Sequence, residues 1–234
     1  MTRLCVCAFV NSSFVCTNVI YFLLIGCVFY FYSNFISNNE GLRIQQQNEG
    51  GGVEVLIEDV VSNNNNVEGI FVSGTGFTIR NVESSNNGFG LIVAGYPTYP
   101  PVENPRTEIT LDGKVSLNNN GCCGLQVSSM FELPPRGTVR ITGELITDRN
   151  EYTGVIMTYD TNINIVLANG SSSGKSNKSS SGSLTACGNG EYDIVNQGDG
   201  GSFGGSDYTC NSISTSNNLP VCNSCPKCSN FLFA

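Results

Sequence analysis

The feature that most constrains this chain is a repeat in which a glycine is followed by alternating apolar residues. Its copies span residues 41–44, 69–72, 90–93, 124–127 and 154–157, so successive glycines lie 28, 21, 34 and 30 residues apart. A polar, Asn-rich run precedes each glycine, and its last Asn lies two to four residues before that glycine. A nearly constant interval between the Asn run and the glycine, repeated every 21 to 34 residues, predicts stacked structural repeats.

Two further strand signals lie between each glycine and the next polar run. The first is an alternating, β-branched segment at residues 53–57, 77–80, 108–111, 138–141 and 162–165. The second is a short apolar element at Val60-Val61, Val82, Val115 with Leu117, and Leu145-Ile146. Such segments, bounded by turn residues, are typical of half-buried strands. Each repeat is therefore predicted to supply three short strands that pair in parallel with their copies in the next repeat.

Stacking places equivalent residues above one another. We expect one apolar ladder in the interior, made by Leu42, Ile70, Leu91, Leu125 and Val155. We also expect the Asn runs to form one corner, because Asn tolerates the left-handed backbone of a sharp turn and stacked Asn side chains can hydrogen-bond between repeats. Insertions fall between the first and second strands, at residues 45–52, 94–106 and 130–137, and should loop out on one side.

Other repeat and globular folds fit the sequence less well. Helical periodicity is not found after residue 40, and the Leu-x-x-Leu-x-Leu spacing of leucine-rich repeats is missing. The glycine phase, the Asn corner and the three strands resemble the pectate-lyase-like right-handed parallel β-helix superfamily over residues 34–196. The cysteine-rich tail resembles that of cysteine-tailed β-helix proteins predicted from algal genomes. The resemblance implies an architecture and says little about activity.

The chain is expected to have three parts. Residues 1–33 are an apolar N-terminal segment, residues 34–200 a short right-handed parallel β-helix of about six rungs, and residues 201–234 a Gly- and Cys-rich C-terminal cap. At a strand spacing of about 4.8 Å, six rungs would form a solenoid roughly 29 Å long. Both of its ends must then be covered.

The N-terminal segment can be interpreted in three ways. Residues 4–39 carry no charge, and residues 14–32 form an apolar stretch behind Arg3 that is long enough to cross a bilayer. This pattern predicts a signal anchor with the rest of the chain secreted or on the extracellular face of the membrane. Alternatively the stretch is a gene-model artefact, since the repeat already begins near residue 33, or it is an apolar cap on the solenoid.

Five of the eleven cysteines lie in the C-terminal part, at Cys187, Cys210, Cys222, Cys225 and Cys228. An exported chain would oxidise them into a disulfide-stapled cap, with Cys187–Cys210 as the preferred pair and one cysteine left over. The alternative is zinc held by Cys222, Cys225, Cys228 and a fourth thiolate, but the export signal favours disulfides. We therefore expect no metal and no cofactor. The Asn-x-Ser sequences at Asn169 and Asn177 are candidate glycosylation sites.

Charge and residue content restrict the function. A net charge of −8 argues against nucleic acid, and equally against tight binding of acidic polysaccharides. The chain has no His and no Asp-Asp pair, and Arg140-Ile141-Thr142 lacks the lysine of the Arg-Ile-Lys found in pectin hydrolases. Lys114, beside Asp112, is the only lysine of the repeats outside the Ser- and Gly-rich insertion at residues 169–183. Asp59 and Asp112 recur at strand ends, where they are expected to cap turns. No catalytic residue is predicted.

Aromatic residues near the insertions are the candidate ligand contacts: Tyr96, Tyr99, Phe131, Tyr152 and Tyr159. Exposed tyrosines can stack on sugar rings while their hydroxyls hydrogen-bond. The alternative is that they pack against the flank of the solenoid. The sequence thus predicts an extracellular or surface-anchored, non-catalytic module that binds polysaccharide or cell-surface glycan, or serves structure and adhesion. The alternative function is a polysaccharide lyase or glycoside hydrolase.

Overall fold

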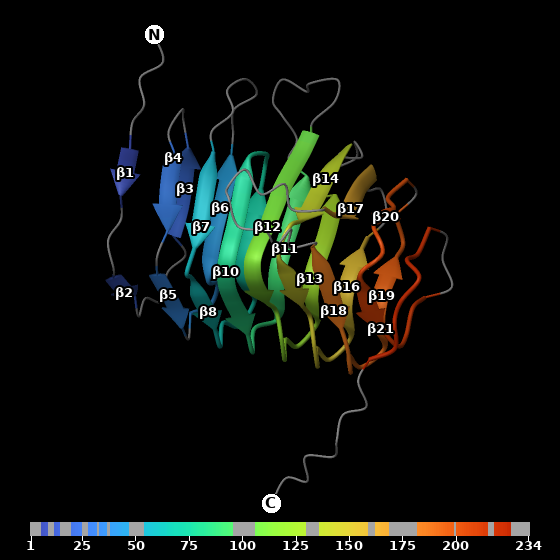
Figure 1. Ribbon diagram of the computed structural model, residues 1–234. Coiled ribbons are helices and arrows are strands. Elements are labelled where there is room, and N and C mark those ends of the chain that lie inside the picture. Colours follow the sequence, from blue (N-terminus) through green and yellow to red (C-terminus); the bar gives the residue numbers. More distant parts are fainter. Residues whose placement is uncertain are drawn as a thin grey trace, which may run out of the picture.

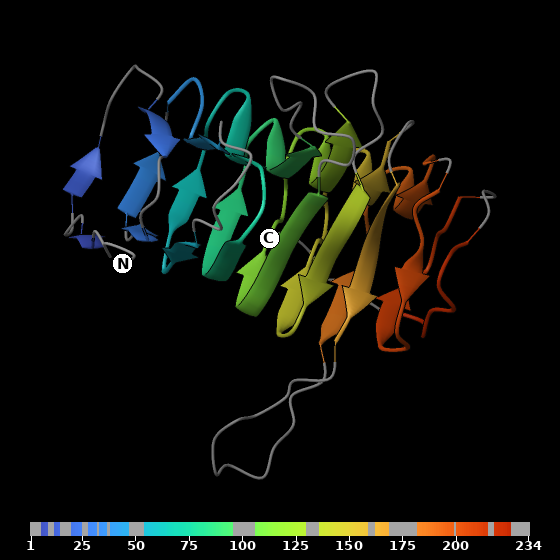
Figure 2. The same ribbon diagram turned by 90° about the horizontal axis from the view of Figure 1, so that it is seen from above.

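The protein is an all-β chain whose strands pair in parallel. The computed structural model describes residues 6–8, 12–14, 20–24, 28–31, 33–36, 38–46, 54–95, 106–129, 136–158, 162–168, 182–198, 200–214 and 218–225. No helix occurs among these residues, and every pair of described strands is parallel. The strands follow one another from the N-terminal to the C-terminal end in Figures 1 and 2, so repeats adjacent in sequence are adjacent in space.

The seven-stranded sheet holds the first strand of each repeat in chain order. Its members are β3 (Ile20–Leu24), β6 (Leu42–Gln46), β9 (Glu68–Ser73), β11 (Phe89–Gly95), β13 (Cys123–Ser129), β16 (Thr153–Met157) and β19 (Tyr192–Asn196). The apolar ladder expected from the sequence is confirmed: Leu42, Ile70, Leu91, Leu125 and Val155 pair in sequence, and each is fully buried.

The fourteen-stranded sheet has two rows. The first row holds β1 (Val6–Ala8), β4 (Val28–Phe31), β7 (Val55–Glu58), β10 (Phe77–Ser85), β12 (Arg106–Ser116), β14 (Arg136–Ile141), β17 (Asn162–Leu167) and β20 (Phe203–Gly204). The second row holds β2 (Ser12–Phe14), β5 (Ser33–Ile36), β8 (Val61–Asn63), β15 (Glu144–Ile146), β18 (Ser183–Ala186) and β21 (Tyr208–Cys210). These rows match the second and third strand signals of the sequence.

The two rows meet at a bend that β10 and β12 pass through without a break. A left-handed residue lies at the bend in three successive repeats: Asp59 with φ 53°, Asn81 with φ 51° and Gly113 with φ 59°. The pairing of β10 with β12 shifts there by one residue, between Arg80 and Val82. Asp, Asn and Gly are the residues that adopt this conformation at least cost, which explains their recurrence.

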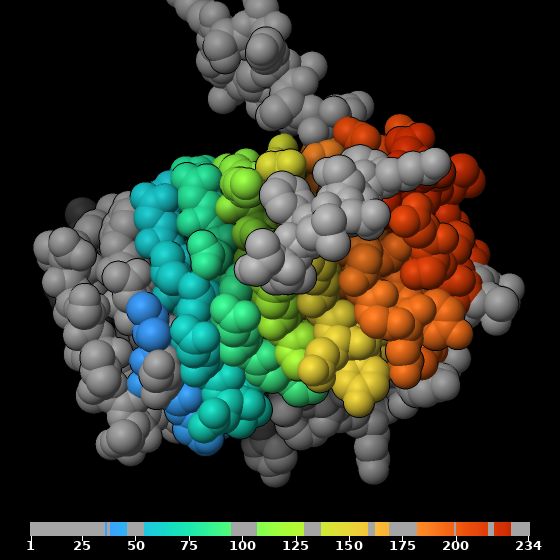
Figure 3. All heavy atoms as spheres, turned by 90° about the horizontal axis from the view of Figure 1, so that it is seen from below, coloured from blue at the N-terminus to red at the C-terminus, as the bar shows by residue number. Residues whose placement is uncertain are grey.

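The core fills the space between the two sheets. Alternate residues of the first row point inward and are buried, among them Phe77, Ile79, Ile109, Leu111, Val139 and Ile141. Fully burying one such side chain contributes about 1.5–3 kcal/mol, so the stack is held mainly by these apolar ladders. In the space-filling view of Figure 3 the repeats appear as successive bands from blue to red.

An asparagine ladder runs along one corner, as the sequence predicted. Its members are Asn65, Asn87, Asn120, Asn150 and Asn189. Each of the first four donates from its backbone N and its side-chain Nδ2 to the Oδ1 of the next member. For Asn120 and Asn150 both distances are 3.0 Å. The residue just before each member has a positive φ: Asn64, Asn86, Asn119, Arg149 and Gly188.

The ladder explains the glycine of the repeat. A Cβ on Gly124 would lie 2.9 Å from Nδ2 of Asn150 and 2.8 Å from the carbonyl oxygen of Gly154. Any side chain at this position would therefore collide with the ladder of the next repeat. The constant spacing between the Asn run and the glycine follows from this close approach.

The apolar N-terminal stretch contributes strands where the structure describes it. Within residues 14–32, β3 pairs with β6 and β4 pairs with β7, both in parallel. Among the described residues there is no helix with the length and apolar character needed to cross a membrane.

Candidate functional site

A polar groove lies on the outer face of the fourteen-stranded sheet, across β7, β10, β12 and β14. Its volume is about 220 Å³. The residues that line it are Glu54, Gly76, Phe77, Thr78, Glu108, Ile109, Thr110, Thr138 and Arg140. Phe77 and Ile109 are buried and form its floor, whereas Glu54, Glu108 and Arg140 are exposed. The alternation that sends Ile109 and Leu111 inward sends Thr110 outward, so the strands themselves aim the polar side chains into the groove.

Strand pairing places Glu54, Gly76 and Glu108 in one line across three repeats. Phe77 pairs with both Val55 and Ile109, and the backbone bonds Val55 N to Gly76 O (3.0 Å) and Gly76 N to Glu108 O (2.9 Å) continue that line. Gly76 has no side chain, so none stands between the two carboxylates. Neighbouring strands are about 4.8 Å apart, which puts the two glutamate α-carbons about 10 Å apart.

Hydroxyl and guanidinium groups lie beside the two glutamates. The pairing of β10 with β12 aligns Thr78 with Thr110. The pairing of β12 with β14 aligns Thr110 with Arg140 and Glu108 with Thr138. The groove therefore combines carboxylate acceptors, hydroxyls that donate and accept, and one guanidinium donor. Such a set can hydrogen-bond a ligand that carries many hydroxyl groups.

An ion-pair network borders the groove near the bend. The guanidinium of Arg80 lies 3.2 Å from Oε1 of Glu58 and 2.8 Å from Oδ2 of Asp112. Thr142 donates its hydroxyl to Oδ1 of Asp112 at 3.0 Å. Burial raises the pKa of Asp112, but the hydrogen bonds from Arg80, Thr142 and the Gly113 backbone outweigh it, so the net pKa is lowered. Asp112 thus has a wider role than the turn capping expected from the sequence.

The predicted aromatic contacts are only partly covered by the structure. Tyr96, Tyr99, Phe131 and Tyr159 lie outside the described residues. Tyr152 is 50% exposed and lies at the asparagine corner, where its backbone N donates to Cys122 O at 3.0 Å. It is not among the residues that line the groove. Tyr192, which the sequence interpretation did not single out, is also exposed and donates its backbone N to Tyr152 O.

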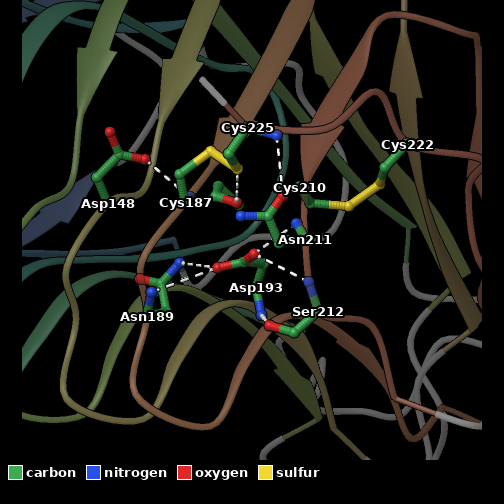
Figure 4. Close-up of a disulfide and its surroundings, with 10 residues drawn as sticks. Asp148, Cys187, Asn189, Asp193, Cys210, Asn211, Ser212, Cys222 and Cys225 are labelled. Atoms are coloured by element: carbon green, nitrogen blue, oxygen red, sulfur yellow. Dashed lines mark hydrogen bonds between the residues drawn. A yellow bond between two sulfur atoms is a disulfide. The ribbon is translucent and has the colours of Figure 1, made fainter. Parts of the chain in front are cut away.

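The cap is closed by two disulfides, and the preferred pairing Cys187–Cys210 is wrong. Cys187 bonds to Cys225 and Cys210 bonds to Cys222 (Figure 4). Cys210 and Cys222 are neighbours because Cys210 N donates to Asn223 O and Asn223 N donates to Tyr208 O. The chain then continues to Cys225, which reaches back to the last complete repeat.

The same two disulfides bear on the zinc alternative. Since Cys222 and Cys225 are each oxidised, neither offers the thiolate that zinc requires. The described residues contain no group of three or more His, Cys, Asp or Glu side chains suited to a metal. Cys228 and the glycosylation candidates Asn169 and Asn177 lie outside the described residues. Disulfides of this kind are consistent with an oxidising, extracellular environment.

Asp193 connects the asparagine ladder to the cap (Figure 4). It is 1% exposed and occupies the position of the repeat glycine, because the residues on either side of it pair with those on either side of Gly154. Its Oδ2 accepts the backbone N–H groups of Asn211 at 2.7 Å and Ser212 at 3.1 Å. In the sequence, Asp193-Ile194-Val195 stands where the repeat has a glycine followed by apolar residues, and this change from Gly to Asp was the available signal for the role of Asp193.

Comparison with known proteins does not add to these observations. Protein-family models, curated proteins and solved structures were each searched, and none matches this chain. The function therefore has to be inferred from the groove, the corner and the cap themselves.

Proposed function

We propose that the chain is a short right-handed parallel β-helix of the pectate-lyase-like kind that works outside the cytosol as a non-catalytic, carbohydrate-binding module. Parallel strands in chain order and a continuous asparagine ladder support the architecture. The two cap disulfides support an oxidising compartment. Attachment to a membrane through residues 14–32 stays a prediction of the sequence.

The groove is the observation that carries the binding proposal. Its carboxylates, threonine hydroxyls and guanidinium are spread along four successive repeats, as a ligand with regularly spaced hydroxyls requires. Enclosed sites for drug-sized molecules occupy about 300–1,000 Å³, so a groove of about 220 Å³ suits a polymer segment lying on the surface. Glu54, Glu108 and the net charge of −8 disfavour acidic polymers, which leaves neutral polysaccharides.

Affinity measurements with matched threonine variants test this proposal. Full-length protein would be titrated with a panel of soluble neutral and acidic polysaccharides by calorimetry. Thr110→Val removes a hydroxyl from the groove, and Thr185→Val removes an equivalent outward hydroxyl from β18, outside it. We expect Thr110→Val to weaken binding of a neutral polymer about 2–10-fold, since a lost neutral hydrogen bond is worth about 0.5–1.5 kcal/mol. Thr185→Val should bind like the parent.

Two results would contradict the proposal, the first by removing carbohydrate binding and the second by removing the groove as its site. One is that the folded parent binds no member of the panel, which would leave a structural or adhesive role. The other is that Thr110→Val and Thr185→Val lose affinity equally, which would place the ligand elsewhere. Thermal unfolding of each variant shows whether its fold is intact.

The alignment of Glu54 and Glu108 favours one second candidate, glycoside hydrolysis. Inverting hydrolases place two carboxyl groups about 6.5–9.5 Å apart, and two glutamates separated by two strand spacings can reach that range. One would act as general acid and the other would activate water. Release of new chain ends, assayed with and without calcium, tests this. Turnover that disappears in both Glu54→Gln and Glu108→Gln would replace the non-catalytic proposal.

A further inference from the structure

Cys122 and Cys123 form a pair of adjacent thiols at the asparagine corner, where β13 begins. Their Sγ atoms lie 2.8 Å apart, and neither takes part in a disulfide. Cys123 is 2% exposed and faces the core, while Cys122 is half-buried. The two side chains thus differ in burial, as alternation along a strand requires, yet the two sulfur atoms still meet.

The backbone holds this pair firmly in place. Cys122 donates its N–H to Gly88 O at 2.7 Å, and its own carbonyl accepts the N–H groups of Tyr152 and Thr153. Both neighbouring repeats thus fix the peptide that carries the thiols. The two sulfur atoms are close because of this corner and need no large movement to react with one another.

We propose that Cys122 and Cys123 are a redox-active site that closes reversibly into a vicinal disulfide by exchange with a low-molecular-weight disulfide such as oxidised glutathione. The site is separate from the groove and does not depend on the proposed carbohydrate binding.

The exchange begins at Cys122. Its thiolate attacks one sulfur of the small disulfide, that S–S bond breaks, and one small thiolate leaves. Cys123 then loses its proton to solvent and attacks Sγ of Cys122, which forms the ring and releases the second small thiolate. In total two cysteine thiols are oxidised and one small disulfide is reduced to two thiols.

Exposure and acidity both assign the first attack to Cys122. A hydrogen bond from Cys123 lowers the pKa of the Cys122 thiol, although burial and the charge of Glu191 oppose the shift. The same hydrogen bond, together with burial, raises the pKa of the Cys123 thiol. The more accessible sulfur is thus also the one that more readily becomes a thiolate.

The ring is expected to be easier to reduce than the cap disulfides. Adjacent α-carbons across a trans peptide are about 3.8 Å apart, less than the roughly 4.4–6.8 Å found in ordinary disulfides. The cap pairs have α-carbon distances of 6.0 Å and 5.4 Å, inside that range. Strained disulfides have higher reduction potentials, so a Cys122–Cys123 disulfide would be labile where the two disulfides of the described cap are durable.

Mass spectrometry of one tryptic peptide tests the site. Residues 115–136, between Lys114 and the cleavage after Arg136, contain these two cysteines and no other. Full-length protein would be equilibrated in buffers graded from reduced to oxidised glutathione, quenched with acid, alkylated and digested. As the share of oxidised glutathione rises, we expect this peptide to change from a doubly alkylated form to an unalkylated form. The unalkylated form should be lighter by two hydrogen atoms than the peptide with two free thiols. The change should occur in buffers where Cys187–Cys225 and Cys210–Cys222 stay oxidised.

Single variants test the order of attack. Cys123→Ser should accumulate a glutathione adduct on Cys122, because the resolving thiol is missing. Cys122→Ser should react on the order of tenfold more slowly at the buried Cys123. The proposal is overturned if the wild-type peptide stays doubly alkylated or only carries adducts in the most oxidising buffer, or if its disulfide is reduced only together with the cap. Equal rates for the two variants would overturn the assignment of Cys122 as the attacking sulfur.

Discussion

Asn189 donates its side-chain Nδ2 to Oδ1 of Asp193 at 2.8 Å, and its backbone N lies 3.3 Å from the same oxygen. This repeats the two-bond pattern by which Asn150 contacts Asn189. The carboxylate of Asp193 therefore takes the place that the next asparagine would occupy.

Changing Asp193 should weaken the cap. In Asp193→Asn one of the two oxygens becomes an amide that cannot accept the bonds now made to it, which should lower the free energy of unfolding by about 1–3 kcal/mol. Asp193→Gly, which restores the repeat residue, should cost more because all the acceptors are lost. Urea unfolding measures both, with the exposed Asp207→Asn as control. Equal stability of Asp193→Asn and the parent would contradict this role.

The asparagine ladder should be far less tolerant than the residue beside it. Asn120→Ala leaves the bonds from Asn87 without an acceptor and removes the Nδ2 bond to Asn150, while the backbone N–H bond to Asn150 is kept, so we expect a loss of roughly 2–4 kcal/mol. Asn119→Gly is the matched control. Asn119 has φ 55°, a conformation that glycine adopts readily, and the variant keeps the backbone N–H that donates to Asp148 O. We expect it to change stability by less than about 0.5 kcal/mol. Similar losses in both variants would show that the corner, and not the ladder, is what matters.

Two neighbouring glycines should respond differently to alanine. In Gly124→Ala the new methyl group would crowd Asn150 and the Gly154 carbonyl, an overpacking that costs about 1–3 kcal/mol. In Gly121→Ala the nearest atom would be 3.7 Å away, an ordinary contact. Thermal unfolding of the two variants should therefore differ clearly, with Gly121→Ala close to the parent. The reverse order would disprove the link between the glycine phase and the ladder.

Asp112 should make stability depend on acid pH. Because its pKa is lowered in the folded state, the stability it contributes is complete above the unfolded pKa of about 3.9 and is lost as pH falls through the lower folded value. Asp112→Asn should remove this part of the acid sensitivity while leaving the protein less stable at neutral pH. Urea unfolding from about pH 6 downwards measures it, with the exposed Glu144→Gln as control. Parallel pH profiles of parent and Asp112→Asn would contradict the assignment.

The two cap disulfides should contribute unequally. Loop entropy gives about 4 kcal/mol for the pair separated by 38 residues and about 3 kcal/mol for the pair separated by 12. Cys225→Ser should thus destabilise the cap more than Cys222→Ser. Alkylation of the unfolded variants checks the pairing, since Cys225→Ser should free Cys187 and Cys222→Ser should free Cys210. If Cys187 stayed protected in Cys225→Ser and Cys210 stayed protected in Cys222→Ser, the pairing Cys187–Cys210 preferred from the sequence would be revived.

Much of the fold could be predicted because each repeat carries its own copy of the signal. The apolar ladder from Leu42 to Val155 and the asparagine corner followed from the phase of single residues. The groove could not be predicted in the same way, because Glu54 and Glu108 are aligned only by strand pairing. Phe77 pairs with both Val55 and Ile109, the residues that follow the two glutamates. Insertions of unequal length hide that pairing in the linear sequence.

Cysteine spacing failed for a related reason. The spacing of the cysteines in the sequence does not favour the pair Cys187–Cys210 over other pairs. The path of the chain after Cys210 decides which sulfur atoms meet. That path depends on bonds such as Cys225 N to Asn211 Oδ1, which no local pattern announces. The Arg80–Asp112 ion pair was missed because its partners belong to adjacent repeats and lie 32 residues apart.

The asparagine ladder also has a direction, and this sets how such a chain can lengthen. Every member donates toward the C-terminal end, so a duplicated repeat placed before residue 187 would find a donor on one side and an acceptor on the other. A copy placed after Asp193 would meet a carboxylate that offers no N–H group to the next asparagine. Tandem duplication during evolution, or deliberate elongation by design, can therefore extend the ladder only before residue 187. The carboxylate of Asp193 ends the ladder on the other side.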